Sequence, residues 1–184
     1  MAGFGAKYPC WAPLKTEPAN ADPTYDPGQV LGKLVSASRS ITNAEGELYG
    51  DDMRAEYLSE FASGTLDLSV TALTDAQLTA LYGANVADGE ITFDKDDEIP
   101  YGGVGFYQVL VRGGVKYYRG YFYPKCKAII GDASAETKGS SINFTPEGLQ
   151  FAIDCPAYGG WCKVETFDTE AAAIAWVKGK CSIS

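Results

Sequence analysis

The sequence predicts a mainly β fold of the α+β class: a β-sandwich or barrel with one or two short flanking helices, a long loop between strands and an extended N-terminal arm. Three observations predict it. Apolar and polar residues alternate along several segments, glycine- and proline-containing turns separate some of them, and only two stretches show helical spacing. With 184 residues, of which 46% are hydrophobic, the chain can bury the core of one domain.

Residues 1–28 are the predicted arm, ahead of a single domain at 29–184. Five of the nine prolines fall in this arm, and proline interrupts helices and is excluded from central strands. A first strand is expected from Val30 to Ile41, where the residues alternate loosely between apolar and polar. Its polar face carries Ser36, Ser38 and Ser40.

An acidic segment, residues 42–62, follows this strand. It shows no sustained periodicity, and it combines six carboxylates and the single Arg54 with several large apolar residues. Loops of this length are uncommon unless they are functional or disordered, and disordered ones seldom hold so many large apolar side chains. We therefore expect a long hairpin-like loop that becomes ordered against another surface.

Regular alternation resumes between Ser63 and Leu73 and predicts a half-buried strand. Its polar positions include Asp67, Ser69 and Thr71. A short helix follows, because Thr74 and Gln77 form a capping-box pattern and Gly83 is placed to end the helix.

Two hairpins are expected in the second half of the chain. A Gly-Gly pair, suited to the positive φ angles of a tight turn, joins residues 105–111 to 115–123. The glycines at 102–105 indicate a bulge or a close approach of two backbones. A Thr-Pro-Glu-Gly turn separates the apolar runs at 140–144 and 149–155.

The last predicted elements are a strand at 161–167 and a C-terminal helix at 168–179. Asp168 is the expected N-cap of this helix, and an acidic residue in its first turn with lysines in its last turn would favour the helix dipole. Alanine, isoleucine, tryptophan and valine residues supply an apolar packing face.

The composition excludes several functions. The chain contains no histidine, so Ser-His-Asp triads, Cys-His dyads and histidine-ligated metal sites are impossible. No carboxylate pair has convincing spacing for a glycosidase, and we expect a protein that is not an enzyme and binds no metal or other cofactor. The formal charge of −9 disfavours binding to nucleic-acid phosphates and to anionic membranes.

Three weaker features have plainer interpretations. The acidic run at 94–98 has calcium-like ligands, but it lacks the glycine and distal glutamate of an EF-hand, which favours a solvated turn. Aromatic residues at 107–123 suggest a stacking platform for single-stranded nucleic acid, yet sheet packing explains their alternation. Cys155 and Cys162 form a candidate thiol pair across a turn, and we expect both to be free thiols in a reducing cytosol.

Several segments occur in a recognisable order. They are KYPCWAPL, GKLVSASRSI, NAEGELYGDDMRAEYLSEFASGTLDLSVTAL, TDAQLTALYG, PYGGVGFYQVLVRGGVKYYRGYFYPKCKA, AETKGSSINFTPE and FDTEAAAIAWV. In this order they resemble the major tail (tail-tube) proteins of long-tailed, non-contractile bacteriophages, the siphophages. The resemblance extends from Lys7 to Val177, and the cysteine-rich segment at 155–162 and the final CSIS depart from it.

The resemblance implies a structural virion protein that self-assembles into hexameric rings, which stack into the tail tube and conduct DNA during ejection. It implies no catalytic residues. The partners would be further copies of the chain and the tape-measure, tail-terminator and distal tail proteins of the phage, while double-stranded DNA passes through without specific binding. Synthesis and assembly would take place in the host bacterial cytoplasm, and the final location would be the phage tail.

The resemblance also implies roles for two sets of residues. The long loop at 42–62 would reach the neighbouring ring. Its expected contact residues are Glu45, Glu47, Leu48, Tyr49, Asp51, Asp52, Met53, Arg54, Glu56, Tyr57 and Leu58. The polar faces of the two flanking strands would suit the inner wall of a tube, although an ordinary solvated sheet face would look the same. The candidate lumen-facing residues are Ser36, Ser38, Ser40, Asp67, Ser69 and Thr71.

Two other functions remain open. A β-sandwich used for adhesion at a surface would share the β pattern, but the N-terminus lacks the apolar core of a signal peptide. A single-stranded nucleic-acid-binding module would use the aromatic hairpin, and its binding would depend steeply on salt. No apolar run is long enough to span a bilayer, so we expect a soluble protein without membrane contact.

Overall fold

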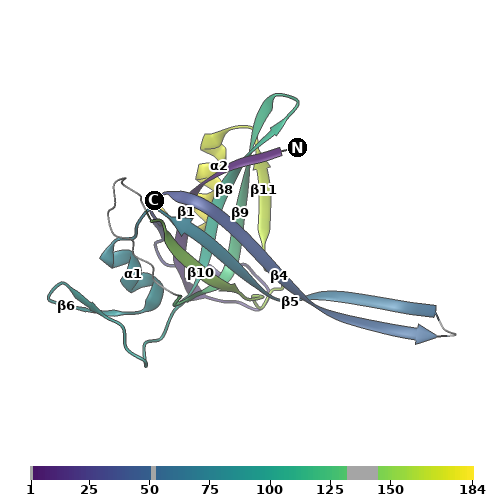
Figure 1. The fold of residues 1–184 in the computed structure, drawn as a ribbon, viewed down its shortest axis with the longest axis horizontal. Coiled ribbons are helices and arrows are strands. Elements are labelled where there is room, and N and C mark those ends of the chain that lie inside the picture. Colours follow the sequence, from purple (N-terminus) through teal and green to yellow (C-terminus); the bar gives the residue numbers. More distant parts are fainter. Residues whose placement is uncertain (1, 51–52, 132–144) are drawn as a thin grey trace, which may run out of the picture.

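The computed structural model describes residues 2–50, 53–131 and 145–184 (Figure 1). The strands of this part are β1 (Ala2–Thr16), β2 (Thr24–Tyr25), β3 (Gln29–Val30), β4 (Leu34–Gly50), β5 (Met53–Val70), β6 (Asn85–Ala87), β7 (Glu90–Thr92), β8 (Tyr101–Arg112), β9 (Val115–Ile129), β10 (Glu147–Ile153) and β11 (Lys163–Phe167). The helices are α1 (Asp75–Tyr82) and α2 (Glu170–Lys180). The predicted mainly β class with short flanking helices is confirmed. Neither of these two helices has the length and apolar character needed to cross a membrane.

Within these ranges the strands build one large antiparallel sheet and one small hairpin. The large sheet has the order β2-β1-β8-β9-β10-β5-β4, with β3 beside β1 and β11 beside β9, whereas β6 and β7 pair only with each other. One edge of β9 pairs with β8. Along its other edge, residues 118–122 pair with β11 and residues 126–129 pair with β10. The sheet curls, because β1 and β4 lie towards opposite ends of this order and yet contact each other.

The curled sheet encloses the larger of two cores. Trp11, Leu66, Tyr123 and Phe151 are fully buried in it and come from four different strands. α1 packs against this core through Leu81. Burying one large apolar side chain stabilises the fold by about 1.5–3 kcal/mol. This core therefore holds the two sides of the curled sheet together, β1, β8 and β9 on one side and β10, β5 and β4 on the other.

A second core lies on the other face of β1, β8 and β9, under α2. Ala173 and Val177 of the helix are fully buried there against Cys10, Tyr107 and Phe122. α2 therefore covers the outer face of the sheet at β1, β8 and β9. On the other side of the sheet, neither described helix covers the outer face of β4, β5 and β10 (Figure 1).

Two predictions that rest on local signals are confirmed. The Thr74 hydroxyl accepts the N–H of Gln77, and the Gln77 side chain accepts the N–H of Thr74 at 2.9 Å, which completes the capping box of α1. Gly83 ends this helix with φ +68°. Gly113 and Gly114 have φ values of +58° and +80° and form the turn between β8 and β9, as expected for a tight hairpin.

The prediction that no central strand runs through the extended arm is wrong for its first half. β1 pairs with β8 from Ala2 to Pro13, and its middle is part of both cores. The register shifts between Lys7 and Cys10, where Tyr8 has φ +61°, so Pro9 falls at a bulge. Within the described ranges, the strands that pair with its other edge are the two-residue strands β2 and β3. Prolines are tolerated at bulges and sheet edges, and for this reason they do not prevent this strand.

Other boundaries also differ from the predictions. β4 begins at Leu34, while Val30 belongs to β3, which pairs with β1. The segment at 42–62, predicted as a hairpin-like loop, does form a hairpin, but its two sides are regular extensions of β4 and β5. α2 is capped by Thr169, whose hydroxyl accepts an N–H of the first turn at 3.3 Å, and not by Asp168. The strand predicted at 140–144 lies outside the described residues.

Candidate functional site

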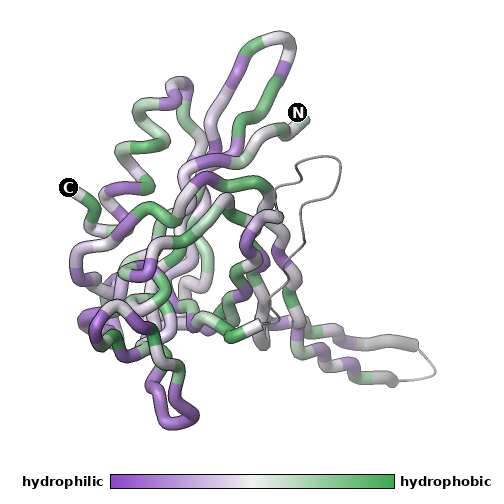
Figure 2. Tube along the Cα trace, turned by 60° about the vertical axis from the view of Figure 1, so that its left-hand side comes forward, coloured by the Kyte–Doolittle hydropathy of each residue, from purple (hydrophilic) through white to green (hydrophobic). Residues whose placement is uncertain are grey.

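The hairpin formed by β4 and β5 is the most prominent feature of the surface. Its strands pair from Leu34 and Val70 at the sheet to Gly50 and Met53 at the far end. Its outer half stands clear of the body in two views turned by 60° (Figure 1 and Figure 2). Among the predicted contact residues, Asp51 and Asp52 and the side chains of Tyr49, Met53 and Arg54 lie outside the described part of the chain.

One face of this hairpin exposes two leucines. Leu48 pairs with Glu56 and Gly46 pairs with Leu58, so the leucines are diagonal neighbours on the same face. Leu48 is 63% exposed and Leu58 is 61% exposed. Adjacent, largely exposed leucines on a protruding element are typical of a surface that binds another molecule.

The opposite face of the hairpin is acidic as well, like the leucine face with its Glu56 and Glu60. Glu47 pairs with Tyr57 and Glu45 pairs with Ser59, and Tyr57 is 47% exposed. The predicted contact residues with described side chains are all exposed on the hairpin; they are Glu45, Glu47, Leu48, Glu56, Tyr57 and Leu58. The hairpin thus presents both apolar and negatively charged groups well away from the core.

An aromatic clamp holds the root of the hairpin. The ring of Phe61 stacks on Trp161 with centroids 4.6 Å apart and planes 8° apart, and the Arg39 guanidinium lies 5.5 Å from the Trp161 ring centroid. The same Arg39 approaches Cys162 Sγ at 3.9 Å. Sequence reasoning missed Trp161, because nothing in its local pattern indicates a partner 100 residues earlier.

The candidate lumen-facing residues in β4 and β5 share the outer face of the sheet. Their cross-strand pairs are Ser36 with Ser69, Ser38 with Asp67, and Ser40 with Thr65. Gln150 of β10 extends this polar sheet face and donates from Nε2 to Asp67 Oδ1 at 2.8 Å. Four of the predicted residues line a shallow groove of about 500 Å³ here. They are Ser36, Ser38, Asp67 and Ser69.

Thr71 is the exception among the predicted lumen-facing residues. β5 ends at Val70, so the alternation that would place Thr71 beside Ser69 stops one residue earlier. Its hydroxyl instead accepts the backbone N–H of Lys33 at 3.2 Å. Thr71 therefore lies just beyond the strand, outside the cross-strand pairs of this face, and its lumen-facing role stays a prediction.

The polar sheet face is nearly neutral in its described part. Asp67 contributes one carboxylate. Thr65, Ala152 and Lys127 are opposite one another on three neighbouring strands, so the Lys127 side chain lies on the same face as Thr65 and Asp67. Half of the 24 acidic residues instead fall at 45–60 and 88–98. The negative charge of the chain is therefore concentrated away from this face.

Both members of the candidate thiol pair are free cysteines. Cys155 is exposed, whereas Cys162 is partly buried beside Arg39. Burial raises the pKa of the Cys162 thiol, and the Arg39 guanidinium opposes this rise. Neither thiol is placed as an activated nucleophile.

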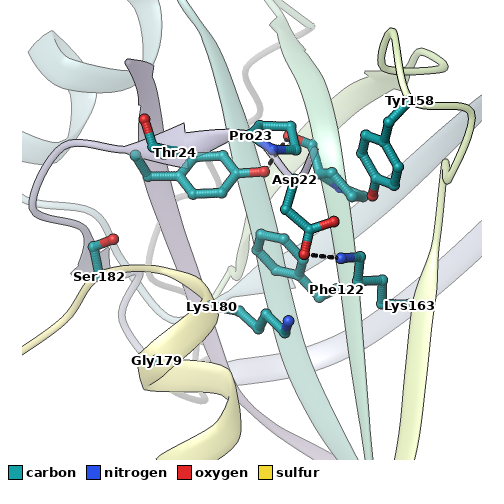
Figure 3. A pocket seen from close by; sticks show the side chains of 11 residues that line it. Asp22, Pro23, Thr24, Phe122, Tyr158, Lys163, Gly179, Lys180 and Ser182 are labelled. Carbon is teal, nitrogen blue, oxygen red and sulfur yellow. Dashed lines mark hydrogen bonds and ion pairs between the residues drawn. The ribbon is translucent and has the colours of Figure 1, made fainter. Parts of the chain in front are cut away.

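A pocket of about 280 Å³ lies where the N-terminal segment meets β9, β11 and the end of α2 (Figure 3). Asp22 points towards Lys163 and forms an ion pair with it, and Lys180 lines the same pocket. The bond from Lys163 lowers the pKa of the Asp22 carboxyl. The Tyr25 hydroxyl is also engaged, since it donates to the Pro124 carbonyl at 2.8 Å. These contacts join the N-terminal segment to β9 and β11.

The other sequence candidates are packed or solvated. Tyr107, Phe122 and Tyr123 of the predicted stacking platform are buried in the two cores. The acidic residues at 94–98 form an exposed turn, in which Asp97 accepts the N–H of Asp94 at 2.7 Å. Across the described ranges, no three cysteine, aspartate or glutamate side chains gather to hold a metal ion.

The chain matches no protein-family model. No curated protein matches it either. The fold and these surfaces define a mainly β protein with a projecting acidic hairpin and a polar sheet face that no described helix covers.

Proposed function

We propose that this protein is a subunit of a bacteriophage tail tube, which assembles into hexameric rings that stack into a conduit for DNA. The projecting β4–β5 hairpin is the observation that carries the proposal. Beyond its root, the described residues of the hairpin belong to neither core, yet the hairpin stands clear of the body and exposes Leu48 and Leu58 (Figure 1). A subunit that must contact the next ring in a stack would use such an element.

The energetics of the hairpin support a contact between rings. An isolated two-stranded hairpin is marginally stable in water, because it has no apolar face to bury. Leu48 and Leu58 would gain about 25 cal/mol for each Å² that a neighbouring subunit covers. Docking against the next ring would therefore order the hairpin and stabilise the stack at the same time.

The edge of β4 supports a lateral contact within a ring. β4 is the last strand in the sheet order, and no strand of the described ranges pairs with its outer edge. A long unpaired edge is a template for pairing with another chain. In the proposed ring, the neighbouring subunit covers this edge.

The polar sheet face would line the bore. Small hydroxyl side chains and the near balance of Asp67 and Lys127 give DNA phosphates no cluster of cations to bind. DNA would slide past such a wall without being held. The tape-measure, tail-terminator and distal tail proteins remain proposed partners at the inside and the two ends of the tube.

Shortening the hairpin tests its role. In the variant, residues 46–58 are replaced by Asn-Gly, which closes Glu45 onto Ser59 with a tight turn and keeps the root intact. We expect normal folding by circular dichroism and rings without tubes by negative-stain microscopy. Val115→Ser, which removes an exposed apolar side chain from the β8–β9 turn, is the matched control and should form normal tubes. Tubes of normal length from the shortened variant would refute the contact.

A further inference from the structure

The fold brings two cysteines from opposite ends of the chain into contact. Cys10 lies in β1 and Cys181 directly follows α2, 171 residues later. Their Sγ atoms are 2.9 Å apart, and both residues are fully buried. Cys126, Cys155 and Cys162 have no sulfur partner among the described contacts. The contact joins the first strand to the last helix.

Both backbones around this contact are firmly positioned. Cys10 is opposite Gly105 of β8, and its Sγ lies 3.4 Å from the Gly105 carbonyl oxygen. A Cβ at Gly105 would come within 3.4 Å of that sulfur, so the glycine leaves room for the sulfur pair. The N–H of Cys181 donates to Val177 at 3.0 Å, and the N–H of Ile183 donates to Lys178 at 3.0 Å. The end of α2 is thereby fixed over the sulfur of Cys10.

We propose that Cys10 and Cys181 form a disulfide that closes under oxidising conditions and ties β1 to the end of α2. With oxidised glutathione, one cysteine thiolate attacks the glutathione disulfide and releases one reduced glutathione. The second thiolate then displaces the other, so one sulfur–sulfur bond forms, one breaks, and two electrons pass to glutathione. A disulfide needs a separation of about 2.05 Å, so the two sulfurs must approach by less than about 1 Å.

The surroundings determine when the bond forms. Burial, together with the contact to Cys181, raises the pKa of the Cys10 thiol well above its ordinary value. Little thiolate is therefore present at neutral pH, and the buried pair reacts slowly once the chain has folded. The bond forms most readily while the chain folds in an oxidising buffer. A cytosolic glutathione pool keeps the pair reduced, and oxidising surroundings close it.

The bond encloses almost the whole chain in one covalent loop. Disulfides that close long loops restrict the unfolded chain most, so the oxidised protein should unfold at a clearly higher temperature than the reduced one. An upward shift of several degrees is expected for a domain of this size. The shift should disappear when a reducing agent is added.

Refolding the whole chain tests the proposal directly. The denatured, reduced protein is refolded in a glutathione redox buffer at about pH 8.5, alkylated and digested with trypsin. We expect peptide 8–15 linked to peptide 181–184, with three of the five thiols alkylated. Five alkylated thiols, or a bond within peptide 139–163 that contains Cys155 and Cys162, would overturn it. This experiment needs no variant and so does not depend on whether a variant folds.

Thermal unfolding with and without dithiothreitol supplies the second readout. The wild type and the control Cys155→Ser should both lose the upward shift when dithiothreitol is added. Cys181→Ser should unfold at the same temperature in both conditions, because it cannot form the bond. A redox-dependent shift that persists in Cys181→Ser would contradict the assignment.

Discussion

Glu17 joins three segments that are far apart in the sequence. Its carboxylate accepts from Lys125 Nζ at 2.9 and 3.0 Å and from the Ala157 N–H at 2.8 Å. The Lys125 hydrogen bond is the main cause of the lowered pKa of this carboxyl. Because a lowered pKa favours the charged form in the folded state, Glu17 stabilises the fold while it is ionised.

Glu17→Gln tests this residue through its pH dependence. Glutamine keeps one acceptor oxygen and loses the charge, so we expect the free energy of unfolding to fall by about 1 kcal/mol at pH 7. The difference from wild type should persist above about pH 4.3, the unfolded pKa of glutamate, and vanish as the pH falls through the lower folded pKa. Urea unfolding of both proteins at several pH values measures this difference in the free energy of unfolding. Asp26→Asn, at an exposed pair with Lys15, should change stability by less than about 0.5 kcal/mol.

Gly102 is a site where two backbones approach closely, as its sequence context predicted. The register between β8 and β9 shifts between Gly102 and Val104. A Cβ at Gly102 would come within 2.6 Å of the Ala12 carbonyl oxygen and would also meet the indole of Trp11. We expect Gly102→Ala to lower the free energy of unfolding by about 1–3 kcal/mol.

The matched control for this substitution is Gly148→Ala. Gly148 also lies in a strand, β10, but a Cβ there would meet no atom within 4 Å. We expect a change of less than about 0.5 kcal/mol. Equal melting temperatures for the two variants would contradict the close approach at Gly102.

At the scale of elements, the Trp161 clamp determines how the hairpin leaves the sheet. Trp161 contacts Phe61 of β5 and Arg39 of β4, one from each strand of the hairpin. It therefore limits bending at the root more than either strand could alone. Aromatic pairs in this geometry contribute about 0.5–1.5 kcal/mol beyond the area that they bury.

Trp161→Ala should loosen the hairpin without unfolding the protein. We expect faster amide hydrogen exchange at residues 40–44 and 61–65, while exchange in β8 and β9 stays unchanged. Assembly should weaken, because each subunit would have to order its hairpin on docking. Trp176→Ala, which removes a tryptophan of α2 that packs beside Phe167 and not at the hairpin, is the control and should leave exchange at 40–44 unchanged. Unchanged exchange at the root in Trp161→Ala would show that the clamp does not restrain it.

Elements with local signals could be predicted from the sequence, and elements that depend on distant partners could not. The capping box of α1 and the Gly-Gly turn each lie within a few residues, so their geometry follows from the residues themselves. β1 was missed because its prolines are acceptable only through the bulge near Tyr8 and its mostly unpaired outer edge. The stacking of Phe61 on Trp161 and the Cys10–Cys181 contact likewise arise from the fold.

The candidate site was predicted in part. Alternation placed Ser36, Ser38, Asp67 and Ser69 correctly on one face, because side-chain direction in a strand has a period of two. Thr71 follows the last residue of β5, and alternation could not show this, since the end of a strand depends on its pairing partners. The acidic segment contained no clean alternation, because neither face of a solvent-exposed ribbon has to be apolar.

At the scale of the whole molecule, the proposed tube separates charge from the path of DNA. The formal charge of −9 comes largely from the hairpin and from residues 88–98, while the polar sheet face holds one carboxylate and one lysine in its described part. An inner wall of this kind needs no strong repulsion to let DNA pass. The acidic hairpin instead predicts that the ring surface it docks against carries exposed basic residues.

Electron cryomicroscopy of the purified protein at high concentration tests the central claim most directly. The tail-tube proposal predicts stacked six-fold rings in which the β4–β5 hairpin of each subunit contacts the adjoining ring and Asp67 faces the bore. A protein that stays monomeric at all concentrations, or an assembly whose hairpins extend into solvent with Asp67 on the outer wall, would contradict it.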